Sequence, residues 1–536
     1  MLGMREAVER LRAAIERKEK ILIYGDYDVD GTTAVVILKT AIEICGGSCV
    51  FHVPHRLREG YGMRDDVIER AAADGVTLII SVDTGIRAFA AADTCKRLGL
   101  DLIVTDHHLP EAEGVPQAVA VLNPNQHGCN YPCKVLCGAG VAFKVAQALL
   151  EDNPSYTRLI TSFLKIVAIA TIADAVPLTG ENRVFAKLGL DGLRSPVNPG
   201  LRALLEVSDL GSRAISSGDV AFRLAPRLNA AGRMDVAKDV VDLFTLRDAS
   251  LAREIAHRLN SLNAERQAEE ARIVSEIQAR LEGDPQQRDA FCIVVDGEGW
   301  HKGVIGIVAS RIVDRYNRPA LVIAREGDAA QGSGRSIEAF HLMDALESCS
   351  ALFSRFGGHA HAAGFALDSS RIPELRAAVD AWARSRLTPD DLRPVLRYDA
   401  EISLNDVTPK LFEFVEQLAP FGMANPEPVF AACGVRVLAP PRLLKERHAK
   451  LRVRQNTASV EISGQANEGK NAVFARPFDL LGWRMWQRIE TEAVIAGDSL
   501  DVVFTIQENS HPDYGGLQLS MCDFRRSTAA SAVAGA

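Results

Sequence analysis

Residues 1–110 alternate short, apolar, β-branched runs with longer segments of helical periodicity. This alternation is typical of βαβ units with right-handed crossovers on a parallel sheet. The expected strands cover residues 21–24, 50–53, 78–82 and 102–105, with helices near 32–45, 65–73 and 86–97 between them. The sequence therefore predicts an α/β fold for this part of the chain.

Acidic and histidine side chains follow three of these strands at the point where each strand ends. They are Asp26, Asp28 and Asp30 after the first strand, Asp83 after the third, and Asp106, His107 and His108 after the fourth. Ligands of such sheets bind beyond the carboxyl ends of the strands, so these side chains should meet at one edge. Mutual repulsion would force several of the carboxylates to take up protons unless divalent cations lie between them.

The type of ligand narrows the choice of metal and of chemistry. Oxygen and imidazole ligands suit Mn²⁺ or Mg²⁺, with Zn²⁺ or Co²⁺ as substitutes. Two ions about 3.5–4 Å apart would polarise a phosphoryl group and activate water as the nucleophile. The spacing Asp-x-Asp-x-Asp-Gly also opens a calcium-binding EF-hand loop, but that loop needs Glu at its twelfth position, where this chain has Ile37. The sequence predicts a metal-dependent phosphoesterase.

The remaining chain shows three further kinds of pattern. A largely helical region covers residues 140–246, and residues 249–281 form one long helix without Gly or Pro. A second α/β pattern runs from 291 to 383, and β-rich segments that suggest a small barrel or sandwich follow residue 390. The predicted domains are 1–248, 285–388 and 389–526, with a connecting helix at 249–284 and a disordered tail at 527–536.

Composition limits the setting in which the protein works. Its 536 residues, 47% hydrophobic and 24% charged, describe a soluble protein of several domains. The N-terminus has no secretory signal, and the most apolar helical stretch, residues 159–173, is short for a membrane span and carries Lys165, so we expect a cytoplasmic protein without a membrane association. Cys129, Cys133 and Cys137 lack a fourth ligand for structural zinc, which favours ordinary buried or loop cysteines.

The net charge of −8 argues weakly against nucleic-acid binding, but a carboxylate-rich metal site accounts for part of it. Local charge is more informative. Between residues 436 and 454 the single acid Glu446 stands among Arg436, Arg442, Lys445, Arg447, Lys450, Arg452 and Arg454. These residues form either a nucleic-acid-binding face or an ordinary solvated surface.

The strand-end motifs resemble those of the DHH phosphoesterase superfamily and, within it, most closely those of the RecJ family of bacterial single-strand-specific 5′-to-3′ exonucleases. The segments that carry the resemblance are GDYDVDGTT (25–33), SVDTG (81–85), Asp106-His107-His108, ATIADAVPL (170–178), GAGVAFK (138–144), ENRV (181–184), APRLNAAGRM (225–234), HKGVIGIVASR (301–311), GSGRS (332–336) and FGGHAHAAGF (356–365). The resemblance is strong over residues 4–430 and looser beyond them. It implies a parallel-sheet DHH domain, a DHH-associated α/β domain behind the long helix, and a C-terminal OB-fold.

The resemblance also implies roles for single residues. The implied metal ligands are Asp26, Asp28, Asp30, Asp83, His107 and Asp174, with Asp26 either a ligand or a neighbour of one. Asp83 would bridge two ions and, with His107 and His108, form the catalytic set, in which His108 contacts the scissile phosphate or a ligand. Asp174 is implied by the resemblance alone, because no strand precedes it.

Several residues outside the metal motifs are candidates for holding the substrate. Ser333 and Arg335 lie beside glycines that let a phosphate approach the backbone, and Arg56 and Tyr61 follow the second strand, where Tyr61 could stack on a base. An ordinary surface turn is the alternative for both segments. The resemblance implies a 5′-phosphate pocket of Arg56, Ser333 and Arg335. The further candidates are Arg227, Asn229 and Arg233, together with His359, whose alternative, like that of His361, is a structural role.

The expected function is 5′-to-3′ digestion of single-stranded DNA to mononucleotides with two Mn²⁺ or Mg²⁺ ions, in DNA repair and recombination. A single-strand-binding protein or a helicase is a candidate partner, and a monomer is expected. One alternative is a DHH enzyme for short oligoribonucleotides or nucleoside bisphosphates, which the β-rich domain disfavours. The other is a degenerate binding subunit, which the complete set of motif carboxylates disfavours.

Overall fold

The computed structural model describes residues 1–56, 58–60, 62–211, 213–234, 237–455, 476–509 and 515–527. The chain divides into two compact units. The first comprises Met1–Pro394 with Gly422–Asn425, and the second comprises Val395–Phe421 with Pro426–Ala536. The two predicted α/β domains and the helix between them thus belong to one unit, and the β-rich domain forms the other.

The first sheet is wholly parallel, as the alternation of the sequence predicts. Its strands are β1 (Lys20–Tyr24), β2 (Ser48–His52), β3 (Val76–Val82), β4 (Asp101–Thr105) and β5 (Ala120–Leu122). They lie in the order β2-β1-β3-β4-β5. The sequence did not indicate β5, which has three residues. The strand order places the segments that follow β1, β3 and β4 side by side at one edge.

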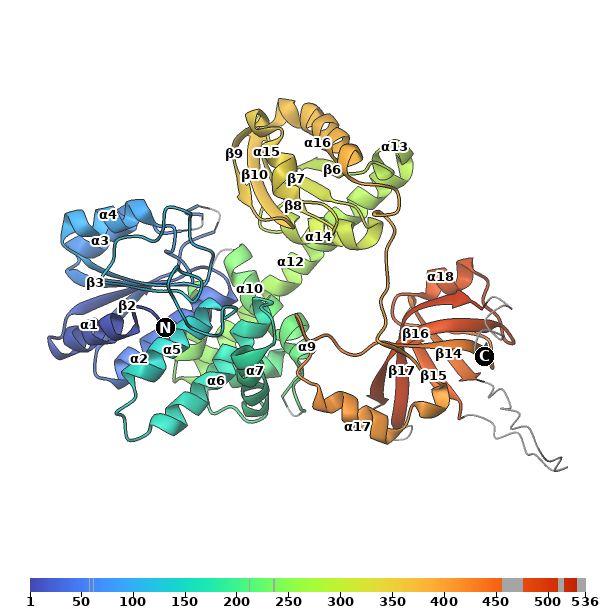
Figure 1. The fold of residues 1–536 in the computed structure, drawn as a ribbon, viewed down its shortest axis with the longest axis horizontal. Helices are drawn as coiled ribbons and strands as arrows, with labels where there is room; N and C mark the ends of the chain where they lie inside the picture. Colours follow the sequence, from blue (N-terminus) through green and yellow to red (C-terminus); the bar gives the residue numbers. More distant parts are fainter. Residues whose placement is uncertain are drawn as a thin grey trace. The chain divides into compact units, whose positions relative to one another are not determined.

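Helices cover both faces of this sheet (Figure 1). On one face lie α1 (Met4–Glu16), α2 (Val29–Ile44) and α5 (Gly138–Leu149), and on the other lie α3 (Asp65–Ala73) and α4 (Phe89–Leu98). Alternate residues of β1 serve the two faces, since Ile21 and Ile23 pack with α2 and α5, whereas Leu22 and Tyr24 pack with α3 and α4. Helix α4 starts three residues later than expected, because the chain first turns at Gly85, whose φ is +111°.

A helical layer follows the sheet. It contains α6 (Tyr156–Ala173), α7 (Gly180–Gly192), α8 (Pro199–Val207), α9 (Ser217–Asp219), the π-helical turn η1 (Val220–Leu224), α10 (Ala225–Met234) and α11 (Lys238–Thr245). Among the described residues, α6 is the one helix whose length and apolarity would suffice to cross a membrane. Its residues Phe163–Ile172 pack instead into the core that α2 and α5 share, as an internal helix of the domain.

The predicted long helix is α12 (Ala249–Gly283), which begins where the Asp248 carboxylate accepts the N–H groups of Ser250 and Leu251. At about 1.5 Å per residue its 35 residues span about 52 Å. The short helix α13 (Pro285–Arg288) follows, and then the second α/β lobe. Residues of α12 and of the second lobe share one core, in which Ile273 and Ile277 pack with Trp300 and Val308.

The second lobe is a mixed sheet in the order β6-β7-β8-β10-β9. Its strands are β6 (Ile293–Glu298), β7 (Ala320–Glu326), β8 (Ala329–Arg335), β9 (Phe353–Gly358) and β10 (Ala362–Asp368). Only the β6–β7 pair is parallel. The accompanying helices are α14 (Ile305–Tyr316), α15 (Leu342–Glu347), η2 (Ser350–Leu352), η3 (Ser369–Arg371) and α16 (Ile372–Arg386). This lobe matches the second α/β domain that the sequence predicts.

The second unit is a β-barrel. Its strands are β11 (Ala400–Glu401), β12 (Phe430–Val437), β13 (Arg442–Leu444), β14 (His448–Gln455), β15 (Phe478–Gly482), β16 (Ser499–Asn509) and β17 (Gly516–Arg526), with helices η4 (Leu404–Asp406), α17 (Pro409–Gln417) and α18 (Trp486–Thr491). The sheet order β12-β16-β17-β15-β14 closes on itself because β14 also pairs with β12. Closure into a small barrel is the architecture expected of an OB-fold. The predicted tail falls almost wholly in residues 528–536, outside the described residues.

Candidate metal centre and substrate cleft

The turn after β1 brings three aspartates to the edge of the first sheet. Asp28 is the N-cap of α2, and its carboxylate accepts the N–H of Gly31 at 2.9 Å. Gly31 packs so closely on Asp26 that a Cβ at this position would lie 2.6 Å from the Asp26 nitrogen. Asp26 and Asp30 are buried. The Gly-Asp-x-Asp-x-Asp-Gly sequence therefore works as one tight turn that holds its acids beyond the strand.

The N-terminus of α5 fixes two of the acids. The Asp30 carboxylate accepts the backbone N–H groups of Gly138 at 2.5 Å and Ala139 at 2.7 Å, where the helix dipole favours a negative charge. Gly138 also lies against Asp83, since a Cβ on Gly138 would be 2.5 Å from the Asp83 Cβ. Asp83 itself has a φ of +59°, an uncommon conformation for a residue other than glycine. The GAGVAFK segment thus packs against the metal motifs and fixes the positions of Asp30 and Asp83.

His107 stands at the centre of the acids. Its Nε2 lies 3.2 Å from Asp83 Oδ1, 3.7 Å from Asp30 Oδ2 and 3.8 Å from Asp174 Oδ2. Asp174 comes from the C-terminal end of α6, where it is the C-cap residue. The fourth motif, for which the sequence offered only a resemblance, therefore reaches the same edge from a helix rather than from a strand.

Three overlapping groups of side chains can each hold a cation within the part of the chain that the structure describes. The groups are Asp83-His107-His108, Asp30-His107-Asp174 and Asp26-Asp28-Asp83, and within each the ligand atoms lie within 4.8 Å of one another. Asp83 and His107 each belong to two groups. Every residue that the sequence analysis nominated as a metal ligand is therefore present in this cluster.

The donor set fits divalent metal ions. Asp26 Oδ1 and Asp83 Oδ1 are buried without a hydrogen bond to any described residue, a costly state for a carboxylate oxygen in the absence of a cation. Burial, reinforced by neighbouring carboxylates, raises the pKa of Asp26, Asp83 and Asp174 well above the usual range. Burial lowers the pKa of His107, which favours the neutral imidazole that ligates metals. Cations would relieve both the repulsion and the missing hydrogen bonds.

His108 and Asp106 form a pair beside this cluster. The Asp106 carboxylate accepts the Ile86 N–H at 2.9 Å and lies 2.7 Å from His108 Nδ1. Burial alone would lower the pKa of His108, but the hydrogen bond to Asp106 and the charges of Asp106, Asp30 and Asp28 together raise it. The same pairing lowers the pKa of Asp106 against the effect of burial. Asp106 thus orients His108 and favours its protonated form, rather than belonging to a metal group.

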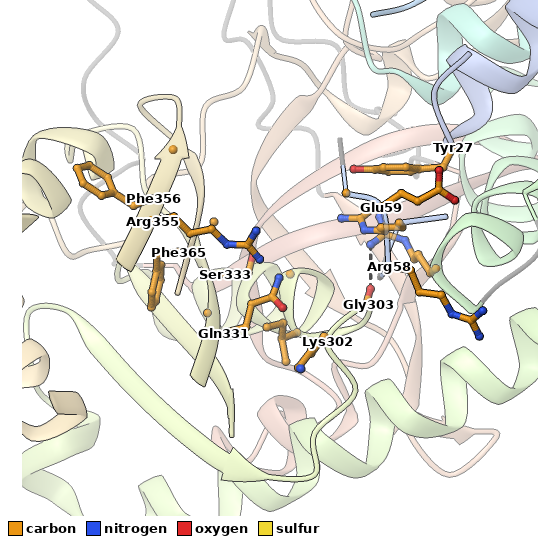
Figure 2. A pocket seen from close by; sticks show the side chains of 18 of the residues that line it. Tyr27, Arg58, Glu59, Lys302, Gly303, Gln331, Ser333, Arg355, Phe356 and Phe365 are labelled. Carbon is orange, nitrogen blue, oxygen red and sulfur yellow. Dashed lines mark hydrogen bonds between the residues drawn. The ribbon is translucent and has the colours of Figure 1, made fainter. Parts of the chain in front are cut away.

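A cavity of about 470 Å³ opens between the first sheet and the second lobe, and we call it the arginine cavity (Figure 2). Tyr27 and Arg58 face Ser333 and Arg355 across it. Five arginines line it, and three of them, Arg56, Arg233 and Arg335, pair with no carboxylate of the described chain. An unneutralised arginine cluster of this kind suits a phosphate.

The three arginines are held in place by neutral partners. Arg56 lies over the Tyr27 ring, 4.9 Å from its centroid. Arg233 donates through Nη1 to the Gly303 carbonyl at 3.1 Å, and Arg335 donates through Nη1 to Ser333 Oγ at 3.1 Å. Burial, with the charges of the neighbouring arginines, lowers the pKa of Arg233 to about 10. The guanidinium therefore stays charged near neutral pH.

The structure brings only part of the predicted substrate residues to this cavity. Arg227 lies elsewhere, since its Nε donates to Asn260 of α12 at 3.0 Å. Asn229 supports the metal turn by accepting the Val29 N–H at 3.3 Å. His359 lines a second cavity beside His108, and Tyr61 lies outside the described residues.

Sequence reasoning overlooked some residues that line the arginine cavity. Gln331 shares a face of β8 with Ser333 and Arg335, so strand alternation could have indicated it. Lys302 lies in the HKGVIG segment, where its charge next to glycine was the available signal.

The barrel carries a row of basic side chains on its outer surface, which we call the basic row: Arg436, Arg442, Lys450, Arg452 and Arg454. Register pairs Arg436 with Arg454 and Arg442 with Lys450, so these side chains share one face of the sheet. Asp479 on β15 contacts Lys450 at 2.9 Å and Arg452 at 2.7 Å. The other two basic residues of this segment, Lys445 and Arg447, lie in the turn before β14.

Comparison with known proteins agrees with this architecture. Residues 20–171 match the DHH family N-terminal domain, residues 289–385 the DHHA1 domain and residues 398–523 the RecJ OB domain. Fold and metal groups together thus define a protein of the DHH class.

Relatives place the chain more narrowly. It is 40% identical over 468 residues to the single-stranded-DNA-specific exonuclease RecJ of Bacillus subtilis, a match that covers 87% of this chain and 58% of that protein. It is 38% identical to the protein of the same name from Dickeya dadantii, with 84% of this chain and 81% of that one covered. The chain belongs to the RecJ family.

A solved structure shows the same arrangement. The crystal structure of RecJ from Thermus thermophilus in complex with Mn²⁺ superposes with a TM-score of 0.80 at 29% identity, covering 98% of this chain and 72% of that one. The same protein in complex with Mg²⁺ gives a TM-score of 0.73 at 28% identity, with 98% and 70% covered. These two structures are thus of a related protein that binds Mn²⁺ and Mg²⁺.

Proposed function

We propose that this chain is an exonuclease that digests single-stranded DNA from the 5′ end to mononucleotides with the help of two divalent cations. The observation that carries the proposal is the pairing of two opposite sites in one unit. Acids that no Lys or Arg of the described chain neutralises lie at the sheet edge, and arginines that pair with no described carboxylate line the cavity beside it. Tyr27, which lines the arginine cavity, lies between Asp26 and Asp28 of the metal turn.

The chemistry follows from what each group can hold. Mn²⁺ or Mg²⁺ bound by these acids would polarise the scissile phosphate and lower the pKa of water. Asp83 belongs to two metal groups and would be a ligand of both ions, whereas Asp28 and Asp174 belong to one group each. His108, oriented at Nδ1 by Asp106, would contact a phosphate oxygen through Nε2. Ser333 and Arg335 would hold the terminal phosphate and so fix which bond reaches the acids.

A polymeric substrate is supported by the barrel. The second unit carries the basic row, and such rows bind the backbone of single strands. The relatives from Bacillus subtilis and Dickeya dadantii bear the name of a single-stranded-DNA-specific exonuclease. A DHH enzyme for short oligoribonucleotides or nucleoside bisphosphates would have little use for this second unit.

The setting follows from the substrate. We infer that the protein acts as a monomer in the cytoplasm, in DNA repair and recombination. A single-strand-binding protein or a helicase would present the strand. Supporting this is the resemblance of the whole chain to bacterial relatives named for their action on DNA.

The deciding experiment uses single-stranded DNA labelled at either end, with Mn²⁺, Mg²⁺ or chelator. We expect labelled mononucleotide to appear first from the 5′ end, only with metal, and not with Asp83→Ala. Asp93→Ala, which removes an exposed acid from α4, is the matched control and should digest like wild type. Release from the 3′ end first, or full activity of Asp83→Ala, would overturn the proposal. Parallel reactions with duplex DNA, RNA and a nucleoside bisphosphate test the alternative substrates.

A further inference from the structure

A second cavity, of about 560 Å³, lies in the same unit and differs in character from the arginine cavity. We call it the Phe89 cavity. Its lining includes the apolar side chains of Met63, Ile86 and Phe89, and His108 and His359 also line it. The Phe89 side chain starts α4 and keeps 36% of its surface exposed, which is unusual for an aromatic residue beside a buried site. The volume falls in the range of about 300–1,000 Å³ typical of ligand sites.

The order of the strands places this cavity next to the metal centre. Along the edge β2-β1-β3-β4, the arginine cavity takes residues that follow β2 and β1, namely Arg56 and Tyr27. The metal groups take acids that follow β1 and β3 and His107 after β4. The Phe89 cavity takes Met63 from the segment between β2 and α3, takes further residues that follow β3 and β4, and shares His108 with a metal group.

The second lobe contributes to both cavities. Ser333 and Arg335 of β8 and Arg355 of β9 line the arginine cavity, and His359, which follows β9, lines the Phe89 cavity. Tyr27 of the arginine cavity lies between two acids of the metal turn, and the Phe89 cavity shares His108 with a metal group. A nucleotide that joins the arginine cavity to the metal groups therefore has the Phe89 cavity beside it.

Arg87 and Asp106 of the Phe89 cavity are engaged within the protein, whereas the buried Thr84 hydroxyl has no hydrogen bond to a described residue. Arg87 donates through Nε to the Leu109 carbonyl at 2.9 Å and lies 3.3 Å from Glu111. The Asp106 carboxylate accepts a hydrogen bond from the Ile86 N–H and lies 2.7 Å from His108 Nδ1. A ligand would consequently be held mainly by apolar and aromatic contact, which every nucleobase can make through its face. Such contact tolerates any sequence, whereas hydrogen bonds to base edges would not.

We propose that the Phe89 cavity receives the base of a nucleotide that adjoins the scissile phosphate, either the one to be released or the first one retained. The proposal rests on the proposed function, because it takes the metal groups as the place of cleavage. Met63, Ile86 and Phe89 supply the contact surface. The cavity would thereby draw the phosphodiester onto the acids without selecting among the four bases.

The test combines changed protein with changed substrate. Strands with a 5′-phosphate carry one abasic nucleotide at the first, second or sixth position, and kcat/KM is measured for wild type, Phe89→Ala and Met63→Ala. Val197→Ala, which removes an apolar side chain that is 84% exposed and outside both cavities, is the control. Binding of the same strands in chelator, followed by fluorescence anisotropy, gives a readout that does not depend on cleavage.

We expect an abasic nucleotide at the first or the second position to lower the kcat/KM of wild type about tenfold, the effect of losing one contact between a base and an aromatic side chain. The position at which an abasic nucleotide lowers kcat/KM identifies the nucleotide whose base enters the Phe89 cavity. Phe89→Ala should lose a similar factor on the intact strand and no longer distinguish it from the abasic one. Val197→Ala and the sixth position should leave the values unchanged.

Two results would overturn the inference. One is equal digestion of the intact strand and of every abasic strand by wild type. The other is a Phe89→Ala variant that still discriminates against the abasic strand as wild type does. In both cases intact DNA is digested, so the proposed function stands. If wild type digests no strand with Mn²⁺ or Mg²⁺, the proposed function fails, and the inference fails with it.

Discussion

The edge of the first sheet that carries the metal groups, called the metal edge below, and the arginine cavity bury charges of opposite sign. The two sites respond differently when no ligand is bound. Burial and mutual repulsion raise the pKa of Asp26 and Asp83, so an empty metal edge can relieve its repulsion by binding protons. Burial lowers the pKa of Arg233 only to about 10, so the arginine cavity stays cationic. The terminal-phosphate site should therefore exist without metal, whereas the site of cleavage should not.

The largest effect on activity is expected from a substitution in the metal edge. Asp83→Asn keeps the size of the side chain and removes the charge that two metal groups share. We expect kcat to fall about 10³-fold or more, since metal ions supply several kcal/mol of transition-state stabilisation. Single-turnover digestion at saturating Mn²⁺ measures the loss. A variant that regains wild-type activity with more Mn²⁺ would show that Asp83 contributes affinity alone.

A break in the arginine cavity should have a smaller and substrate-dependent effect. Arg335→Ala removes a charged donor, worth about 1.5–3 kcal/mol, or about 10- to 100-fold in kcat/KM, for a strand with a 5′-phosphate. A strand with a 5′-hydroxyl should lose much less. Arg315→Ala, exposed on α14 outside the cavity, is the control.

The same pair of strands tests whether the two sites are independent. In chelator, wild type should still bind the 5′-phosphorylated strand more tightly than the hydroxyl strand, and Arg335→Ala should abolish this preference. Equilibrium binding by fluorescence anisotropy measures both affinities. A preference that appears only after Mn²⁺ is added would contradict the independence of the arginine cavity.

The basic row should contribute less to cleavage than to holding the strand. Replacing Arg436 and Arg454 with Ala should weaken binding of long strands by about 5- to 10-fold and lower the slope of log K against log salt by about 1 to 2. A dinucleotide, which is too short to reach beyond the site of cleavage, should be digested as before. The double variant of Arg397 and Lys410, both exposed in the barrel unit, serves as the control.

The smallest effect concerns stability and pH. Because the folded-state pKa of Asp83 is raised, its protonated form is favoured in the folded protein, and its contribution to stability is full below the unfolded pKa and is lost as pH rises through the folded pKa. In chelator, Asp83→Asn should therefore melt higher than wild type, by about 1–3 °C, and more so at pH 8 than at pH 5. Thermal unfolding across this range measures the difference. Adding Mn²⁺ should reverse the order, because only wild type keeps the complete set of ligands.

Sequence patterns predicted the parts of the molecule that depend on local periodicity. The strands before Asp26, Asp83 and Asp106 are apolar and β-branched, so their ends could be located and their acids assembled at one edge. They did not predict the site residues whose positions depend on tertiary packing. Arg227 and Arg233 share one motif, but six residues apart on a helix they point in different directions, and only Arg233 meets the cavity.

Two further features could not be predicted from local periodicity, because each depends on contacts between segments distant in the sequence. Asp174 follows an apolar helix whose end has no distinctive pattern, and only its meeting with His107 shows what it can do. The Phe89 cavity combines segments after β2, β3, β4 and β9 that are distant in the sequence. Neither a strand period nor a helix period describes which distant segments come together.

The packing of Gly138 against Asp83 bears on how substitutions in this protein should be interpreted. The first turn of α5, Gly138–Val141, has no metal-ligating side chain and is absent from the lining of both cavities, yet it leaves no room for even one methyl group beside Asp83. In a survey of random variants, this turn would show the intolerance of a catalytic motif while its residues carry no reactive group. Loss of activity at Gly138 would thus report a displaced neighbour, and the metal edge and the helix beneath it can vary only together.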